Sequence, residues 1–203
     1  MRISKDFNRL ILGIPVWSIY LMGFIPAVVL IHGAYYDNLG PDPLKVLEHQ
    51  LGESALIFLM IVLSINPLKK FFGLNLIKFR RSVGLLSFWY ATLHVLTYLV
   101  LDQQLMLDLI IKDLTKRPYI IVGAIAFFVL IPLALTSNSW SLRWLGLKRW
   151  KNLHIFVYLS TFLGCTHYLM LVKSWPIEPL IYFAFVVFLI ILRWFPKKAS
   201  KDS

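Results

Sequence analysis

The chain contains 203 residues, of which 59% are hydrophobic and 15% are charged, and its mean hydropathy is +0.72. Because a soluble domain is about 45–50% apolar and about 25% charged, this composition argues against a soluble globular enzyme. The single cysteine, Cys165, excludes an intrachain disulfide and makes a Cys-ligated zinc site or an iron–sulfur cluster implausible.

Six apolar segments follow one another along the chain, each close to the roughly 20 residues that a membrane-spanning helix needs. They cover residues 10–31, 54–68, 82–101, 119–136, 154–172 and 179–195. Such spans leave only short loops and tails, so we predict one all-α domain over residues 1–203, a polytopic membrane bundle of six transmembrane helices. The first segment exceeds the apolar core of a signal peptide and lacks a convincing cleavage site, so we expect it to be a retained helix.

The distribution of cations predicts how this bundle lies in the lipid bilayer, because cytoplasmic loops carry an excess of Lys and Arg. The N-terminus, the second-to-third connection, the fourth-to-fifth connection and the C-terminal tail together hold 16 of the 21 Lys and Arg residues and two of the ten acids. We therefore expect both termini in the cytoplasm. The formal net charge of +11 then describes membrane topology, and no nucleic-acid partner is indicated.

Two connections on the opposite side are predicted to form short helices on the membrane surface. The first begins at Asp42-Pro43, an N-cap followed by proline at the first helical position, and continues to Leu51. The second runs from Leu105 to Arg117. On the cytoplasmic side, tryptophans between residues 140 and 150 alternate with cations, which is typical of an interfacial belt.

Ionisable side chains inside a span are costly, and this makes them candidates for function. His94 lies 12 residues into the third span and His167 lies 13 residues into the fifth. At about 1.5 Å per residue, both sit about 18–20 Å from the cytoplasmic end. Two neutral imidazoles that face each other across a bundle are natural axial ligands for haem iron. The structural alternative is a pair of hydrogen-bonded core histidines.

A second level, nearer the cytoplasm, is less symmetric because His154 has no histidine opposite it. Arg80 stands 14 residues before His94, and 14 steps of about 100° bring it within about 40° of the same helix face. A guanidinium has no lone pair for iron but suits a haem propionate or a flavin phosphate. His154 and His167 lie about 140° apart on a straight helix, so if both contact cofactors, either the fifth span tilts or bends or the cofactors lie on different sides of it. His154 is also consistent with an interfacial side chain, and Arg80-Arg81 with a topology signal.

A series of short motifs runs through nearly the whole chain, from the first span to Arg193. They are Gly40-Pro41-Asp42-Pro43, His49, Gly52, Asn66-Pro67-Leu68, Arg80-Arg81, Ala91-Thr92-Leu93-His94, Arg117-Pro118-Tyr119, Gly123, Thr136-Ser137, Arg149-Trp150, Leu153-His154, Tyr158, His167-Tyr168, Val172-Lys173 and Pro179-Leu180-Ile181-Tyr182. In this order and spacing they resemble the MsrQ (YedZ) family of haem-binding membrane subunits. That family belongs to the wider group of ferric-reductase-like transmembrane domains.

The resemblance implies b-type haem, in one or two copies, held by histidines of the third and fifth spans. Those positions correspond to His94, His154 and His167 in this chain. The wider group usually has a second histidine 14 residues from the first, where this chain has Arg80. The level nearer the cytoplasm is then implied to hold either a haem with His154 and a weaker ligand, or FMN, beside Arg80 and Arg81.

The resemblance also implies electron transfer across the bacterial inner membrane. Electrons would pass from membrane quinol, or from a cytoplasmic flavin reductase, to MsrP, a periplasmic molybdopterin enzyme that reduces methionine sulfoxide in oxidised proteins. Members of the wider group usually append a flavin- and nicotinamide-binding domain. Only about eight residues follow Phe195 here, and no glycine-rich dinucleotide turn occurs, so we expect an electron-transfer subunit without a substrate site of its own.

Two further functions fit the sequence. One is a stand-alone transmembrane reductase that passes electrons to ferric chelates or other metals. The other is a non-redox membrane assembly factor or small transporter whose histidines are structural. Pigmented membranes that dithionite reduces would exclude the second function.

Overall fold

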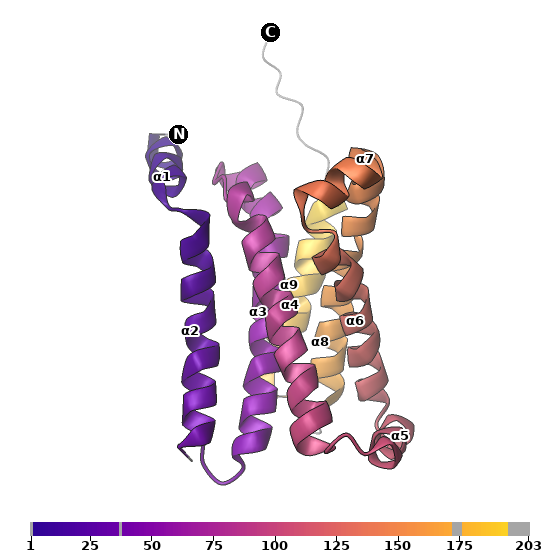
Figure 1. The fold of residues 1–203 in the computed structure, drawn as a ribbon. Coiled ribbons are helices and arrows are strands. Elements are labelled where there is room, and N and C mark those ends of the chain that lie inside the picture. The colour runs from indigo at the N-terminus through magenta and orange to yellow at the C-terminus, as the bar shows by residue number, and fades with distance from the viewer. Residues whose placement is uncertain (1, 37, 172–175, 195–203) are drawn as a thin grey trace.

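The computed structural model describes residues 2–36, 38–171 and 176–194, and these residues contain helices and turns but no strand. The helices are α1 (Arg2–Gly13), α2 (Val16–Tyr35), α3 (Pro43–Phe72), η1 (Ile77–Phe79), α4 (Arg80–Leu96), the π-helical η2 (Thr97–Asp102), α5 (Leu107–Lys116), α6 (Pro118–Leu135), α7 (Ser139–His154), α8 (Phe156–Leu171) and α9 (Ile177–Trp194). The long helices form a bundle, with α1 and α7 at one end and α5 at the other (Figure 1). We refer to these two ends as the α7 end and the α5 end.

Five helical stretches among the described residues are long and apolar enough to cross a membrane, and they confirm the first five predicted spans. They cover residues 16–35, 43–72, 77–102, 118–135 and 139–171. α9 takes the place of the sixth predicted span, which ends at Phe195, outside the described residues. The orientation in the membrane stays a prediction, and Lys173, Lys197, Lys198 and Lys201, on which it partly rests, also lie outside the described residues.

The first span begins six residues later than predicted, because Pro15 lacks a backbone N–H and separates α1 from α2. The separate helix α1 is tied to the connection between α3 and α4. The side chain of Asn8 donates to the Gly73 carbonyl at 2.9 Å and accepts from the Asn75 N–H at 2.8 Å. The Lys78 ammonium donates to backbone carbonyls at the end of α1, so this helix is held at the α7 end.

The predicted surface helix after Asp42 is wrong, because these residues form the first turns of α3. Asp42 does cap the helix, since its side chain accepts a hydrogen bond from the Lys45 N–H at 3.2 Å. However, Leu47 and Leu51 are only 7% and 2% exposed and pack in a core cluster with Tyr90. The apolar stripe that indicated a surface helix is therefore the core-facing side of a transmembrane helix.

The predicted end of the second span at Leu68 is also wrong. α3 continues through Pro67 to Phe72 and stops at Gly73, whose φ of 71° is the left-handed conformation that favours glycine at a helix end. A proline within a helix removes only one N–H from the hydrogen-bond ladder. The α7 end of α3 therefore reaches beyond the predicted span by more than a turn.

The second predicted surface helix is confirmed as α5, at the α5 end of the bundle (Figure 1). The interfacial belt between residues 140 and 150 is itself helical. Asn138 caps α7 by accepting a hydrogen bond from the Ser141 N–H at 2.7 Å, and Gly146, with φ of 71°, kinks the helix. α7 ends at His154 and α8 begins at Phe156, but Ile155 between them keeps helical φ and ψ of −65° and −31°, so the non-helical backbone lies at Gly146, before the predicted fifth span.

Two helix pairs form the centre of the bundle: α3 packs on α4, and α6 packs on α8. α2 joins the first pair through Tyr90, whose side chain is fully buried. The Tyr90 hydroxyl donates to the Gly23 carbonyl at 2.7 Å and accepts from the Ala27 N–H at 3.0 Å. It is thus inserted into the hydrogen-bond ladder of α2, between a carbonyl and an N–H four residues apart.

Candidate functional site

His94 and His167 lie side by side in the half of the bundle nearer the α5 end. His94 comes from the last turn of α4, and His167 from the last turns of α8. Their ring centroids are 6.2 Å apart, and the ring planes make an angle of 73°. The matching depths calculated from the sequence thus correspond to two rings that face each other between the two central helix pairs.

A backbone carbonyl orients each ring and decides which ring nitrogen carries the proton. Nδ1 of His94 lies 2.8 Å from the Glu48 carbonyl oxygen, and Nδ1 of His167 lies 2.7 Å from the Tyr119 carbonyl oxygen. A carbonyl can only accept, so the neutral imidazole must donate from Nδ1. Each Nε2 then carries a lone pair, which is the form that binds a metal ion.

The distance between the two rings fits a single metal ion between them. With metal–nitrogen bonds of about 2.0–2.1 Å and roughly 1.1 Å from Nε2 to each ring centre, two axial imidazoles have centroids about 6.2–6.4 Å apart. The observed 6.2 Å falls in this range. Among the described residues, no group of three or more His, Cys, Asp or Glu side chains could hold a metal ion. Two imidazoles would instead fit an iron whose remaining ligands a bound macrocycle would supply.

His154, at the end of α7, has different surroundings. Its Nε2 lies 3.1 Å from Oγ1 of Thr136, and its ring stacks on Trp150 with a centroid distance of 3.9 Å. The Trp150 indole N–H donates to the Thr136 carbonyl at 2.9 Å. Contacts among these three residues hold the end of α6 to α7.

The proton on His154 is placed on the nitrogen opposite to that of the other two rings. The Thr136 hydroxyl already donates its hydrogen to the Pro132 carbonyl at 2.6 Å. Thr136 can therefore only accept from His154, and Nε2 is the donor. In this arrangement Nε2 of His154 carries the proton, whereas Nε2 of His94 and of His167 carries a lone pair.

Arg80, at the start of α4, belongs to a cationic group at the α7 end. Its guanidinium donates to the Asn66 side-chain oxygen at 3.5 Å and lies close enough to Arg193, Tyr158 and His154 to interact with them electrostatically. The Arg193 guanidinium stacks over the Tyr158 ring, 4.4 Å from its centroid.

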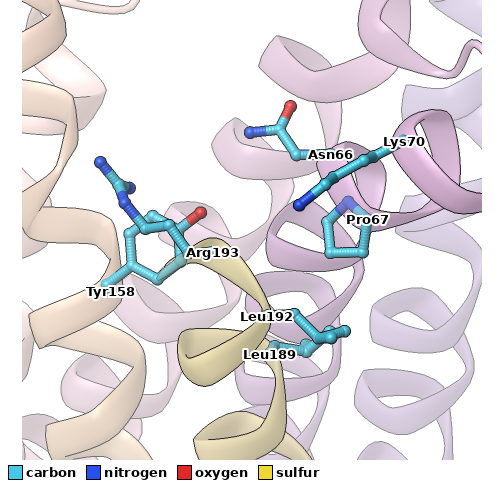
Figure 2. A pocket seen from close by; sticks show the side chains of 7 residues that line it. All are labelled: Asn66, Pro67, Lys70, Tyr158, Leu189, Leu192 and Arg193. Carbon is cyan, nitrogen blue, oxygen red and sulfur yellow. The ribbon is translucent and has the colours of Figure 1, made fainter. Parts of the chain in front are cut away.

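A cavity of about 120 Å³ opens within this group, between α3, α8 and α9. Its lining residues are Asn66, Pro67, Lys70, Tyr158, Leu189, Leu192 and Arg193 (Figure 2). Figure 2 shows the Lys70 ammonium and the Arg193 guanidinium on opposite sides of the opening. Cations are thus present on both sides, and none of the described residues that line this cavity is an acid. Such a lining suits an anionic group such as a phosphate.

Sequence reasoning located the histidines and Arg80 but missed other parts of both sites. Arg81 is exposed on α4 and lines neither site. Lys70 and Arg193 were interpreted only as topology signals, although their positions at the ends of α3 and α9 could have suggested a shared cationic group. The Glu48 and Tyr119 carbonyls are backbone atoms, so no side-chain signal could have identified them.

The fold, the facing histidines and the apolar spans define a class of membrane protein that agrees with comparisons to known proteins. Residues 51–165, more than half of the chain, match the family described as "Ferric reductase like transmembrane component". The chain therefore belongs to this family of transmembrane domains.

Closer relatives narrow the assignment. The "Protein-methionine-sulfoxide reductase heme-binding subunit MsrQ" of Brucella ovis is 47% identical over 178 residues, which cover 88% of this chain and 80% of the relative. The proteins of the same name from Brucella anthropi and Brucella canis are 46% and 47% identical over the same lengths. Within the ferric-reductase-like group, the chain is a member of the MsrQ family.

Proposed function

We propose that this chain is a haem-containing electron-transfer subunit of a methionine sulfoxide reductase system in the bacterial inner membrane. The observation that carries the proposal is the facing pair His94 and His167, with a centroid distance of 6.2 Å and both Nδ1 atoms bound to backbone carbonyls. When bound, one b-type haem supplies a one-electron carrier. The two imidazoles hold its iron, and the surrounding helices keep it within an apolar bundle.

The direction of transfer follows from the position of the pair and from the predicted orientation. With the α7 end in the cytoplasm, His94 and His167 lie in the periplasmic half of the bundle. Electrons enter from membrane quinol or from a cytoplasmic flavin reductase, and they leave at the α5 end to an MsrP-type periplasmic molybdopterin enzyme. The relatives' name, a subunit of protein-methionine-sulfoxide reductase, supports this acceptor.

FMN is the proposed occupant of the α7 end, with its phosphate at the cavity beside Arg80. Support comes from Lys70 and Arg193, which line a cavity with no acid among its described lining residues, and from Arg80, which donates to Asn66 of the same lining. His154 also argues for a single haem, because its Nε2–H is directed to Thr136. A phosphate accepts several charge-assisted hydrogen bonds from guanidinium groups, and these hydrogen bonds are the strong ones.

The haem assignment is tested with His94→Ala and His167→Ala, with His32→Ala as the matched control because His32 is exposed on α2 and contacts Tyr36. We expect each of the first two variants to lose the low-spin absorption spectrum of a six-coordinate haem, while His32→Ala retains it. Absorption spectra and haem stoichiometry of the purified protein give the answer. Full low-spin haem in both ligand variants would refute the assignment.

The flavin assignment is tested with Arg80→Gln against Arg81→Gln, which removes the exposed neighbouring charge. Removing one charged hydrogen-bond donor to a phosphate should weaken FMN binding by at least about tenfold, whereas Arg81→Gln should change it less than about twofold. FMN content and fluorescence titration measure both effects. Equal FMN affinity in the two variants would exclude Arg80 as the phosphate ligand.

The acceptor is tested in membranes that contain the reduced chain. Oxidation of the haem by a purified MsrP-type enzyme, and not by ferric chelates at comparable concentration, is the expected result. Sustained turnover of ferric chelates in membranes without any molybdoenzyme would instead favour the stand-alone metal reductase.

A further inference from the structure

Each of the two facing histidines rests on a glycine of the neighbouring helix. A Cβ atom placed on Gly52 of α3 would lie 3.0 Å from Nδ1 of His94, and one placed on Gly123 of α6 would lie 2.7 Å from Nδ1 of His167. Both distances are shorter than an ordinary contact between carbon and nitrogen. A larger residue at Gly123 would therefore force the imidazole ring to shift, and a larger residue at Gly52 would require the ring to move by a few tenths of an ångström.

The glycines also lie beside the carbonyls that orient the rings. Glu48 is four residues before Gly52, and Tyr119 is four residues before Gly123, so carbonyl and glycine lie one helical turn apart on one face. In a helix this carbonyl accepts from the N–H four residues later, and its second lone pair stays available. Because no side chain stands between ring and backbone, the imidazole reaches that lone pair.

Two buried serines, each two helical turns before its histidine, make a further pair of matching contacts. Ser87, seven residues before His94, donates to the Ala55 carbonyl at 2.9 Å, and Ser160, seven residues before His167, donates to the Ala126 carbonyl at 2.9 Å. Ala55 and Ala126 each lie three residues after their glycine. The pairs α3–α4 and α6–α8 thus hold their histidines with the same set of contacts at the same spacings.

We propose that Gly52 and Gly123 are positioning residues for the haem iron. They admit each imidazole to the backbone of the neighbouring helix, and the resulting Nδ1–H hydrogen bond fixes the tautomer, the ring direction and the basicity of the ligating nitrogen. This inference rests on the proposed haem function and deepens it. The two glycines would not contact the iron. Through the imidazole rings they would affect how strongly the iron is bound and its reduction potential.

The expected effect has a direction. A hydrogen bond from Nδ1–H to a carbonyl raises the basicity of Nε2, the nitrogen that would bind the iron. A more basic ligand stabilises ferric over ferrous iron. Gly52→Ala and Gly123→Ala displace the ring from the carbonyl, so the midpoint potential should rise and the low-spin fraction should fall. Gly123→Ala should have the larger effect, because its Cβ would lie closer to the ring.

The chain offers matched controls on the two helices that carry the histidines, α4 and α8. A Cβ on Gly84 of α4 would meet only a Val62 methyl at 3.8 Å, and a Cβ on Gly164 of α8 would meet only a Leu56 methyl at 3.5 Å. Both are ordinary contacts. Gly84→Ala and Gly164→Ala should therefore keep the potential, the haem content and the spectrum of the unchanged chain.

The experiment is a redox titration of the purified full chain, followed at the haem absorption band, together with haem stoichiometry for all four variants. A rise in potential or a loss of low-spin haem in Gly52→Ala and Gly123→Ala, absent from the controls, is the expected result. Values equal to those of the controls would overturn the inference. If the unchanged chain itself contains no haem, the proposed function fails, and this outcome is distinct from the first.

A second measurement covers variants that lose haem entirely. Thermal unfolding of the haem-free chain is compared for Gly52→Ala in the unchanged background and in a His94→Gly background. If the glycine acts through the ring, Gly52→Ala should be destabilising only where the ring is present. Equal destabilisation in both backgrounds would assign Gly52 to helix packing alone and would refute the positioning role.

Discussion

The two levels of the bundle differ in the hydrogen-bond partners of their histidines. Near the α5 end, His94 and His167 donate from Nδ1 to backbone carbonyls, which leaves a lone pair on each Nε2, and their ring centroids are 6.2 Å apart. Near the α7 end, His154 donates from Nε2 to Thr136, and the groups around it are cations and aromatic rings. The same residue type, in the same kind of helix, is thus prepared for metal binding at one level and for a structural contact at the other.

This difference shows that a histidine inside a membrane is not a metal ligand by residue type alone. The partner of the distal nitrogen fixes the tautomer, and the tautomer decides whether a lone pair faces a cofactor. At the α5 end the partners belong to the helix backbone, which substitution of a side chain leaves in place. At the α7 end the partner is a side-chain hydroxyl, which a single substitution removes.

The largest expected effect comes from comparing one histidine of each level directly. His167→Ala should abolish low-spin haem, whereas His154→Ala should retain the haem content of the unchanged chain, because only the first ring presents Nε2 to a facing imidazole. The measurement is haem stoichiometry with low-temperature absorption spectra. Half of the haem lost in His154→Ala would mean that each level holds one, and the contrast between the levels would disappear.

A smaller effect is expected from the hydroxyl at the α7 end. Thr136→Val leaves the His154 N–H without its acceptor, which should lower the free energy of unfolding by about 1–3 kcal/mol without changing the haem spectrum. Denaturant unfolding in detergent micelles measures the free energy. Thr92→Val is the control, because the Thr92 hydroxyl bonds only a carbonyl of its own helix, Phe88, at 2.8 Å, and such contacts contribute little.

The smallest effect tests whether the two halves of the α5-end site are equivalent. Ser87→Ala and Ser160→Ala each remove one interhelical hydrogen bond between fully buried groups. Each should cost about 0.6 kcal/mol and at most about 1.7 kcal/mol, the range of such bonds within membranes. We expect equal losses in thermal or denaturant unfolding. A loss of stability in only one of the two variants would show that the matching hydrogen bonds contribute unequally to the free energy of unfolding.

Much of the bundle could be predicted because its signals are local. The apolar content of each segment identified the spans, and rise per residue was enough to place His94 and His167 at one depth. The boundaries were less accurate where one signal has two meanings. Pro15 separates two helices, whereas α3 continues through Pro67. The apolar stripe through Leu47 and Leu51 packs in the protein core and does not lie on the membrane surface.

The candidate site required contacts between residues far apart in the chain. His94 and the Glu48 carbonyl are 46 residues apart, and His167 and the Tyr119 carbonyl are 48 apart. The correspondence between the two helix pairs was invisible as a sequence repeat, because it consists of a glycine, an alanine, a serine and a histidine among unrelated residues. Motif resemblance identified Gly52 and Gly123, and only their packing against the rings indicates what they do.

The sequence by itself determined that this is an all-helical membrane protein, and its motifs determined the family. These properties are sums over local composition and spacing, and they survive any particular packing. The tertiary structure decided which histidines lie side by side, on which nitrogen each is protonated, and which cations line a common cavity. Those properties depend on hydrogen bonds of about 3 Å between different helices, and the fold alone brings the bonded atoms within that distance.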